Sequence, residues 1–142
     1  MAIGENITQE VARKLDKNYA RFFGFEVVEA RPGAVILSLA HRPEFEHAPG
    51  WFEGAITSAI GQIAASYSGA TAAAEGWTNL VLDHSVRYVG AAQGERLVAV
   101  GRVTRSGRAI SFTGADVYVE RDGERHLCAQ LEMTMRHTPP RD

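Results

Sequence analysis

The sequence predicts an α+β fold in which a curved antiparallel sheet of about six strands wraps around one long central helix, with an amphipathic helix at the N-terminus. Segment 47–74 contains a short Pro/Gly loop and then a helix of unusually small residues, which other backbone can approach closely. Two β-rich runs precede this helix and four follow it. Because one long helix cannot cover both faces of so many strands, a sheet curled around it is the economical packing.

The composition indicates a single domain, 1–142, with 142 residues and a formal net charge of −2. This charge argues against general nucleic-acid binding, which normally uses clustered positive charge. No apolar run approaches the roughly 20 residues of a membrane helix, and the first residues lack the features of a signal peptide. The single cysteine, Cys128, excludes internal disulfides, and the histidines show no paired spacing for a metal. We therefore expect a cytoplasmic protein without a metal, a nucleic-acid partner or a membrane partner.

The N-terminal segment 7–23 has apolar residues at helical spacing and predicts one amphipathic helix. Asn6 or Thr8 could cap its start, and Gly24 could end it. A hairpin follows, because two runs rich in Val, Ile and Leu are joined by the turn residues Pro32 and Gly33.

The C-terminal half consists of strands separated by short polar or Gly-containing turns. In the last run the apolar residues alternate with polar ones, so one face is covered. The third run changes phase around Gly114, which predicts a β-bulge there. The six predicted strands are 25–31, 34–40, 78–89, 95–105, 108–120 and 125–136.

Gln62 is the one long polar side chain within the apolar part of the central helix. A buried amide needs hydrogen-bond partners. Gln62 is therefore either a structural residue satisfied by the core or part of a ligand site, and the sequence leaves both interpretations open.

The order of elements and the segment PGWFEGAITSAIGQIAASYS resemble the hotdog fold and, within it, the phenylacetate-degradation (PaaI-like) acyl-CoA thioesterases. The likeness extends through LVLDHSVRYVGAAQGERLVAVGRVTRSGR and so covers nearly the whole chain. Proteins of that family are dimers or tetramers that hold acyl-CoA between two subunits. The resemblance therefore implies a homo-oligomer, either a dimer or a tetramer, that acts on acyl-CoA and needs no cofactor beyond the coenzyme A of its substrate.

The resemblance also implies which residues form the site. Gly50 and Gly54 fall where the family has its glycines, and Gly54 at the first turn of the helix would offer its N–H to the thioester carbonyl. Several positions depart from the family pattern. Glu53 replaces the family's His, Ala55 replaces its second Gly, and Gln62 replaces its catalytic Asp.

These departures matter because thioester hydrolysis needs a carboxylate that attacks the carbonyl or takes a proton from water, and an amide does neither. Val81 stands where the family often has the Ser or Thr that steers the water, and His47 stands at its loop Asn. Glu53 and Gln62 are nine residues apart, about 13 Å along a helix, so one chain cannot bring them together. Our hypothesis is that Glu53, together with His47, acts across a subunit interface, where it approaches Gln62 of the partner subunit. The simpler interpretation of Glu53 is a carboxylate favoured by the helix dipole.

Four further residues are candidates for substrate binding. Trp51 and Phe52 flank the start of the central helix, where they could line an acyl pocket or pack in the core or a dimer interface. Arg105 and Arg108, together with Arg102, surround the Ser106-Gly107 turn. The resemblance implies that this turn holds the phosphates of coenzyme A, for which arginine is well suited, although a solvated turn would look the same in the sequence.

Three functions are compatible with these residues. The first is an acyl-CoA thioesterase with a variant site that cleaves a short, medium or aromatic acyl-CoA. The second is a non-catalytic acyl-CoA or acyl-ligand binding protein, which the replacement of the Asp by Gln62 favours. The third is a hotdog dehydratase or hydratase, in which Ser58 would stand at the position of the helical Glu.

Overall fold

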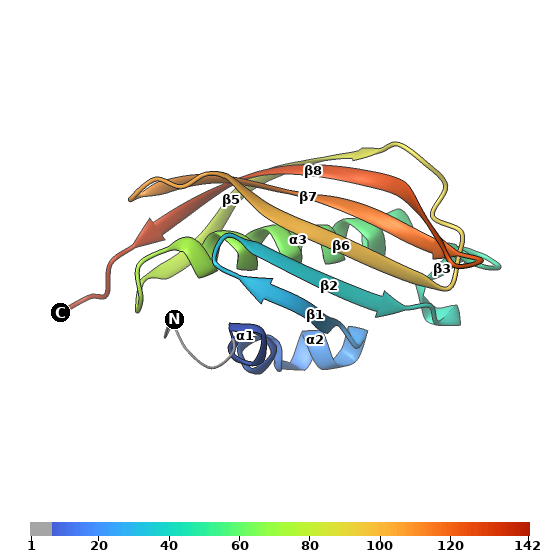
Figure 1. Cartoon of the computed structure of the whole chain (residues 1–142), viewed down its shortest axis with the longest axis horizontal. Coiled ribbons are helices and arrows are strands. Elements are labelled where there is room, and N and C mark those ends of the chain that lie inside the picture. Colours follow the sequence, from blue (N-terminus) through green and yellow to red (C-terminus); the bar gives the residue numbers. More distant parts are fainter. Residues whose placement is uncertain (1–6) are drawn as a thin grey trace.

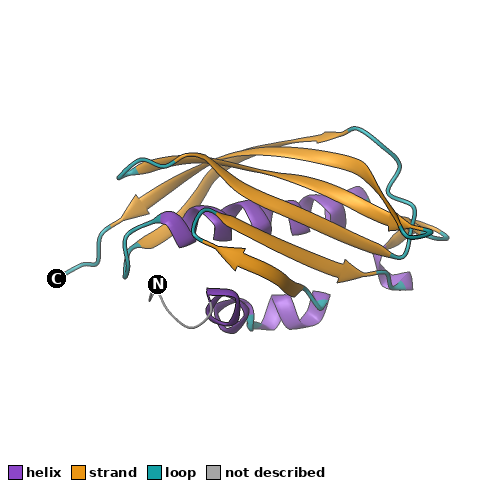
Figure 2. Ribbon diagram, viewed as in Figure 1, coloured by secondary structure: helices purple, strands orange, loops and turns teal. Residues whose placement is uncertain are grey.

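The computed structural model describes residues 7–142, which form three helices and eight strands with short connections (Figures 1 and 2). In chain order these are α1 (Ile7–Leu15), α2 (Asn18–Phe23), β1 (Glu26–Arg31), β2 (Ala34–Ala40), a 3₁₀ turn (Pro43–Phe45), β3 (Glu46–Ala48), β4 (Trp51–Phe52), α3 (Gly54–Ala72), β5 (Thr78–Tyr88), β6 (Arg96–Arg105), β7 (Ile110–Arg121) and β8 (Glu124–Thr138).

The main sheet has six antiparallel strands in the order β1-β2-β6-β7-β8-β5. Figure 1 shows α3 lying along one face of this sheet, with the long strands curving around it. Strands β3 and β4 form a separate small ribbon just before α3. The predicted α+β architecture, a curved antiparallel sheet around one long helix, is therefore confirmed.

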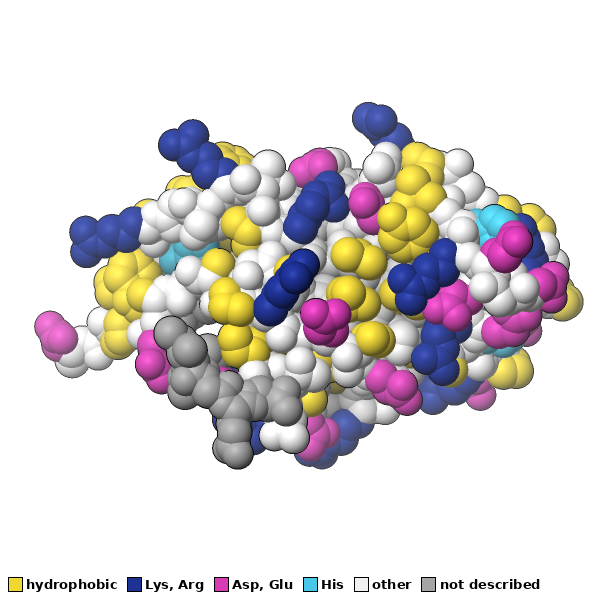
Figure 3. Space-filling view, in the orientation of Figure 1, with side chains coloured by type: hydrophobic (Ala, Val, Ile, Leu, Met, Phe, Trp, Pro, Cys, Tyr) yellow, Lys and Arg dark blue, Asp and Glu magenta, His cyan; other side chains and the backbone are white. Residues whose placement is uncertain are grey.

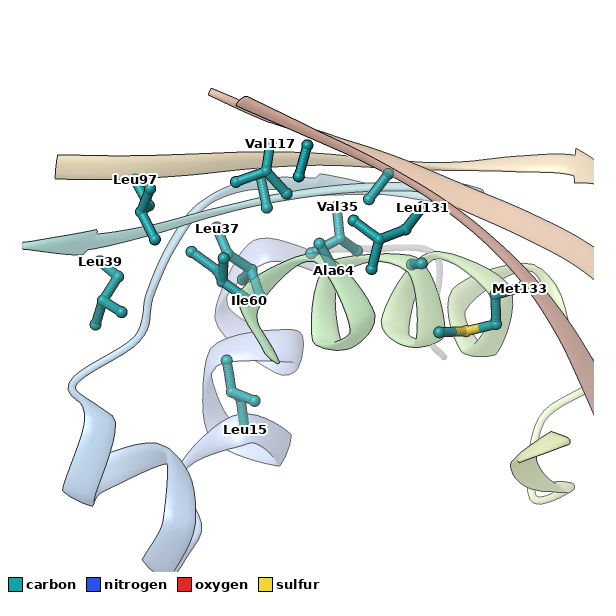
Figure 4. Close-up of a cluster of buried hydrophobic side chains, with 14 of the residues drawn as sticks. Leu15, Val35, Leu37, Leu39, Ile60, Ala64, Leu97, Val117, Leu131 and Met133 are labelled. Carbon is teal, nitrogen blue, oxygen red and sulfur yellow. The ribbon is translucent and has the colours of Figure 1, made fainter. Parts of the chain in front are cut away.

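The core lies between α3 and the concave face of the sheet (Figure 4). Ile60 and Ala64 of the helix are buried in the same cluster as Leu37, Val117 and Leu131 of the strands. The small residues of α3 are needed for this close packing. A Cβ atom at position 61 would lie 2.5 Å from a methyl of Leu131, and one at position 69 would lie 2.4 Å from the sulfur of Met135.

The N-terminal segment differs from the prediction, because it forms two helices instead of one, separated at Asp16 and Lys17. Side chains such as Asp compete with the helical backbone for hydrogen bonds and favour helix ends. Here Asp16 accepts a hydrogen bond from Arg21 Nε at 2.6 Å. Thr8 is not a cap, since its hydroxyl bonds to the backbone of Ala30 in β1, and the alternative cap Asn6 lies outside the described residues. Gly24 ends α2 in the left-handed conformation with φ 82°, as expected.

The predicted bulge at Gly114 is wrong. Gly114 pairs regularly with both neighbouring strands, and the register shifts instead near Val103 in β6 and at Val117 in β7. The phase change was inferred from Ile110 and Phe112, but these two apolar side chains point away from the helix and are exposed. Ser111 and Thr113, which alternate with them, are buried on the covered face, so hydrophobicity predicted the wrong inward side for this part of β7.

The two edges of the sheet are unlike each other. Figure 2 shows α1 and α2 beside β1 at one edge, whereas β5 forms the other edge and pairs only with β8 within the described chain. Leu80, Leu82 and Tyr88 on β5 are exposed.

Positive, negative and apolar side chains are interspersed on the face shown in Figure 3. Within residues 7–142, no helix combines the length and the apolar character required to cross a membrane.

Candidate functional site

The loop before α3 is held by hydrogen bonds from several directions. The Glu46 carboxylate accepts the N–H of Gly50 and lies 3.2 Å from His41 Nε2. Gly50 has φ 79°, a conformation that favours glycine, and its carbonyl accepts the N–H of Gly94 at 3.2 Å. The N–H of Phe52 donates to Ala92 at 2.9 Å. The chain is thus fixed in place just before the helix begins.

Gly54 is the first residue of α3, and within the described chain its N–H donates to no acceptor. Its carbonyl accepts a hydrogen bond from the Tyr88 hydroxyl at 3.1 Å. A Cβ atom at position 54 would lie 3.3 Å from the Tyr88 ring, so glycine lets this ring approach. A free N–H at a helix N-terminus, reinforced by the helix dipole, suits an oxygen that develops negative charge.

Glu53 directly precedes Gly54 in the chain, and His47 lies near Glu53. The His47 Nδ1 atom is 3.9 Å from a Glu53 carboxylate oxygen, and the two side chains are 48% and 53% exposed. Glu53 precedes the helix, and its side chain caps no backbone N–H. The structure therefore brings together two groups that can accept a proton and leaves both accessible to a ligand.

Gln62 lies on the half-buried side of α3, two turns beyond Gly54. Its amide makes no hydrogen bond to any group of the described chain. Within the described chain, nothing therefore supports the interpretation that Gln62 is a structural residue whose amide is hydrogen-bonded in the core. The amide remains available to a ligand, a water molecule or a second subunit.

The remaining predicted site residues lie in two places. Trp51 is half-buried beside His47, with ring centroids 6.2 Å apart, and Val81 is half-buried on β5. Phe52 is only 1% exposed and packs edge-on against His41, so it belongs to the core of the single chain and does not reach a ligand.

Arg105 and Arg108 are exposed at the end of β6 and in the following loop, far along the fold from Gly54. The Arg108 guanidinium lies 5.9 Å from the ring centroid of Trp77. Arg102 is engaged elsewhere, within 3.5 Å of Asp116 and 3.4 Å of Glu132. Only two of the three clustered arginines are therefore free of carboxylate partners within the described residues.

Sequence reasoning missed several residues that shape these regions. Tyr88 contacts Gly54 from a distant strand, and Glu46 holds the loop, but neither forms a recognisable local motif. A pocket of about 390 Å³ lies along the second half of α3, with Tyr67, Trp77 and Lys14 among its lining residues. The part of its lining that α3 contributes begins at Ser66, one helical turn after Gln62.

Cys128 takes no part in this chemistry. It is buried and its thiol donates to the carbonyl of Val117, and burial raises the pKa of the thiol to about 11. A thiol with such a pKa is not a nucleophile at neutral pH. Within the described residues, no three His, Cys, Asp or Glu side chains gather in a way that could hold a metal ion.

The chain matches the thioesterase superfamily over residues 50–126, which span the loop, α3 and most of the following sheet. Since this is more than half of the 142 residues, the chain belongs to the thioesterase superfamily. No curated protein sequence gives a significant match.

Several solved structures share the fold. A thioesterase family protein from Silicibacter pomeroyi is 22% identical, with a TM-score of 0.88 over 93% of this chain and 98% of that chain. A thioesterase from Haemophilus influenzae is 16% identical, with a TM-score of 0.84 over 96% of this chain and 93% of that chain. A variant of a thioesterase enzyme from Staphylococcus aureus is 16% identical, with a TM-score of 0.79 over 87% of this chain and 100% of that chain. At these identities the likeness shows the fold, which is the hotdog fold expected from the sequence.

Proposed function

We propose that this protein is a PaaI-like acyl-CoA thioesterase, which hydrolyses a short, medium or aromatic acyl-CoA through a variant active site. The observation that carries the proposal is the free N–H of Gly54 at the start of α3, beside the His47–Glu53 pair. Acyl transfer to water needs a donor for the developing oxyanion and a base for the water, and these residues supply both.

In the proposed reaction, Glu53 takes a proton from a water molecule while the oxygen of that water attacks the thioester carbonyl. The carbonyl oxygen becomes an oxyanion and accepts the N–H of Gly54. When the tetrahedral intermediate collapses, the C–S bond breaks, the fatty or aromatic acid is released, and the thiolate of coenzyme A takes up the proton. His47, 3.9 Å from Glu53, orients the carboxylate or passes this proton on.

The proposed site is completed by a second subunit. Residues 53 and 62 are separated by about 13 Å along the helix, so Gln62 of one subunit would meet Glu53 of its partner if the two helices pack antiparallel. An exposed edge strand with apolar side chains, such as β5 with Leu80 and Leu82, is suited to covering by another copy. The proposed assembly is a homodimer or a homotetramer.

The substrate contacts follow the same scheme. Arg105 and Arg108 would bind the phosphates of coenzyme A, because guanidinium groups form paired hydrogen bonds with phosphate oxygens. Trp51 and Val81, both half-buried, would contact the acyl group. Coenzyme A enters as part of the substrate, and no other cofactor is required by this reaction.

A second candidate is a non-catalytic acyl-CoA binding protein. It is favoured by Gln62, which makes no hydrogen bond within the described chain and offers an amide where a catalytic carboxylate would stand. An amide can hold a carbonyl or a water molecule but cannot take a proton from it. In this case the pocket would bind a thioester without cleaving it.

The deciding experiment follows thiol release from a panel of acyl-CoAs with the wild-type protein, Glu53→Gln and Gln62→Asp. The matched control is Glu44→Gln, which removes an exposed carboxylate from the 3₁₀ turn in the same loop region. If Glu53 is the base, Glu53→Gln lowers kcat about 10²- to 10⁴-fold while the control retains wild-type activity.

The two candidates give opposite results in this assay. Wild-type turnover that is lost only in Glu53→Gln supports the thioesterase with a relocated base. An inactive wild type together with an active Gln62→Asp supports the binding protein. Wild-type turnover that is unchanged in Glu53→Gln rules out the proposed role of Glu53.

A further inference from the structure

A buried histidine lies at the far end of the molecule from Gly54. His137, near the end of β8, is only 3% exposed, yet both of its ring nitrogens are hydrogen-bonded. Its Nδ1 is 2.6 Å from the Asn79 side-chain oxygen on β5, and its Nε2 is 2.7 Å from the Ser111 hydroxyl on β7. Three strands are therefore linked through one imidazole ring.

The direction of these hydrogen bonds is determined by their partners. The Asn79 amide nitrogen donates to the carbonyl of Trp77 at 3.3 Å, which leaves the Asn79 oxygen to face the histidine. An amide oxygen only accepts, so His137 carries a proton on Nδ1. In the neutral ring, which burial favours, Nε2 accepts the hydroxyl proton of Ser111, and the Ser111 oxygen accepts the N–H of Gly107 at 3.3 Å.

This hydrogen-bonded relay of Asn79, His137 and Ser111 joins two segments that face each other. One is Trp77, and the other is the 106–109 loop, which is also held by the hydrogen bond from the His137 backbone N–H to Ala109 at 2.8 Å. Between them lies a hollow of about 390 Å³, lined by Trp77, the 108–109 segment and residues 136–139.

We propose that Asn79, His137 and Ser111 are positioning residues that hold the 106–109 loop, and with it Arg108, in the arrangement that binds the anionic end of the substrate, and that protonation of His137 releases this loop. The inference rests on the proposed function, because it takes coenzyme A as the anionic ligand of Arg105 and Arg108. None of the three residues touches the ligand itself.

Protonation breaks the relay for two reasons. Both nitrogens of a charged imidazole donate, so the buried Ser111 hydroxyl loses its acceptor. The charged groups that line the hollow with His137 are Arg108 and Arg136, and both are positive. Within the described chain no carboxylate forms an ion pair with His137, and Glu75 lines the neighbouring pocket that shares Trp77 and Asn79.

The electrostatics support the neutral form at ordinary pH. Burial lowers the pKa of His137 from its usual value. Unfolding returns the histidine to a higher pKa, so the unfolded chain binds this proton more readily than the folded one. The relay is therefore complete near neutral pH and is lost as the pH falls through the lowered pKa.

The test uses two variants that change the relay in different ways. Ser111→Ala removes both the donor to Nε2 and the acceptor of the Gly107 N–H, and it should raise the KM for acyl-CoA and the Kd for coenzyme A about tenfold with kcat nearly unchanged. Asn79→Asp keeps an acceptor for Nδ1 but adds a negative charge, which raises the pKa of His137. As the pH is lowered, KM and Kd of the Asn79→Asp variant should therefore begin to rise at a higher pH than those of the wild type.

The measurements are acyl-CoA kinetics and calorimetric binding of coenzyme A between about pH 5 and pH 8, where histidine titrates. Ser68→Ala is the control, because it removes a buried, hydrogen-bonded serine from α3 that has no contact with the relay. Hydrogen exchange of the Gly107 amide gives a readout without a ligand, and exchange should be faster in Ser111→Ala than in the wild type.

The outcomes separate this inference from the proposed function. If acyl-CoA is hydrolysed but KM, Kd and their pH profiles are the same in Asn79→Asp as in the wild type, the inference is overturned and the thioesterase stands. If no thioester is hydrolysed but coenzyme A binding follows the relay, hydrolysis is excluded and the inference holds. If coenzyme A does not bind at all, the inference is overturned. Should Ser111→Ala fail to fold, the pH shift of Asn79→Asp decides alone.

Discussion

The two sides of α3 are packed differently. On the side that faces the sheet, Gly61 and Ala64 are buried, and β6 comes so close that a Cβ atom at position 101 would lie 2.4 Å from the carbonyl oxygen of Ala64. On the other side, Gln62 and Ser66 are half-buried, and Ser66 lines an open pocket. The closed side determines how near the strands can come. On the open side Ser66 donates to the carbonyl of Ile63 at 3.0 Å, whereas the Gln62 amide makes no hydrogen bond within the described chain.

This difference shows how a single helix can serve both stability and function. Close-packed interiors do not tolerate added volume, because neighbouring atoms cannot move away without cost. Polar groups that bind a ligand must instead remain partly unsatisfied in the free protein. In α3 the first requirement is met by Gly61, and the adjacent Gln62, on a different side of the helix, has an amide without a partner in the described chain.

The largest effect is expected from Gly101→Ala on the closed side. The new methyl group would meet the Ala64 carbonyl at 2.4 Å and the Ser68 hydroxyl at 2.5 Å, so the helix backbone has to shift. We expect a loss of about 3 kcal/mol in the free energy of unfolding. Urea denaturation followed by circular dichroism measures this loss. A variant as stable as the wild type would show that the closed side is less tightly packed than described.

Gly61→Ala should cost less than Gly101→Ala. Its Cβ would approach the Leu131 side chain at 2.5 Å, and the end of a leucine side chain can turn aside more easily than backbone. We expect a loss of about 1 to 2 kcal/mol by the same denaturation experiment. Combining the change with Leu131→Val should give less destabilisation than the sum of the two single variants, because the valine leaves room for the methyl group. A fully additive result would place the strain elsewhere.

Tyr88→Phe tests the point where the open side meets the start of α3. It removes the hydrogen bond of 3.1 Å to the Gly54 carbonyl but keeps the ring against the glycine. The expected loss in stability is at most about 1 kcal/mol, because the hydroxyl is partly accessible to water. If Gly54 is the oxyanion donor, the kcat for thioester hydrolysis should fall while stability changes little. An unchanged kcat would show that the Tyr88 hydroxyl does not orient this site.

Gln62→Ala should have the smallest effect on stability, within about 0.5 kcal/mol of the wild type. The Gln62 amide makes no hydrogen bond within the described chain, and alanine favours the helix. Thermal or urea unfolding measures this directly. A loss comparable to that of Gly61→Ala would mean that Gln62 is a structural residue after all, and that the two sides of α3 are less different than the packing indicates.

The architecture was largely predictable because it follows from local patterns. A long run of small residues with larger ones at helical spacing predicts a helix that other backbone can surround, and α3 confirms this. Turn residues located the hairpin of β1 and β2 correctly. Two errors had different causes: Asp16, a residue that favours helix ends, divides the N-terminal helix, and Ile110 and Phe112 lie on the outer face of β7 although they are apolar.

The candidate site was predictable only in part. His47 and Glu53 are six residues apart on one loop, so their proximity follows from the short connection that joins them. Arg108 is exposed, while the ion pairs that engage Arg102 could not be foreseen, since its partners come from β7 and β8. No sequence pattern pointed to Tyr88 beside Gly54.

The sequence by itself determined the fold class, the small-residue helix and the loop that begins it, because these depend on the periodicity and conformational preferences of neighbouring residues. Only the tertiary structure decided which polar groups meet. Asn79, Ser111 and His137 are separated by more than 20 residues from one another, and only the pairing of β5, β7 and β8 brings them within hydrogen-bonding distance. The register between strands is a long-range property, and no local pattern contains it.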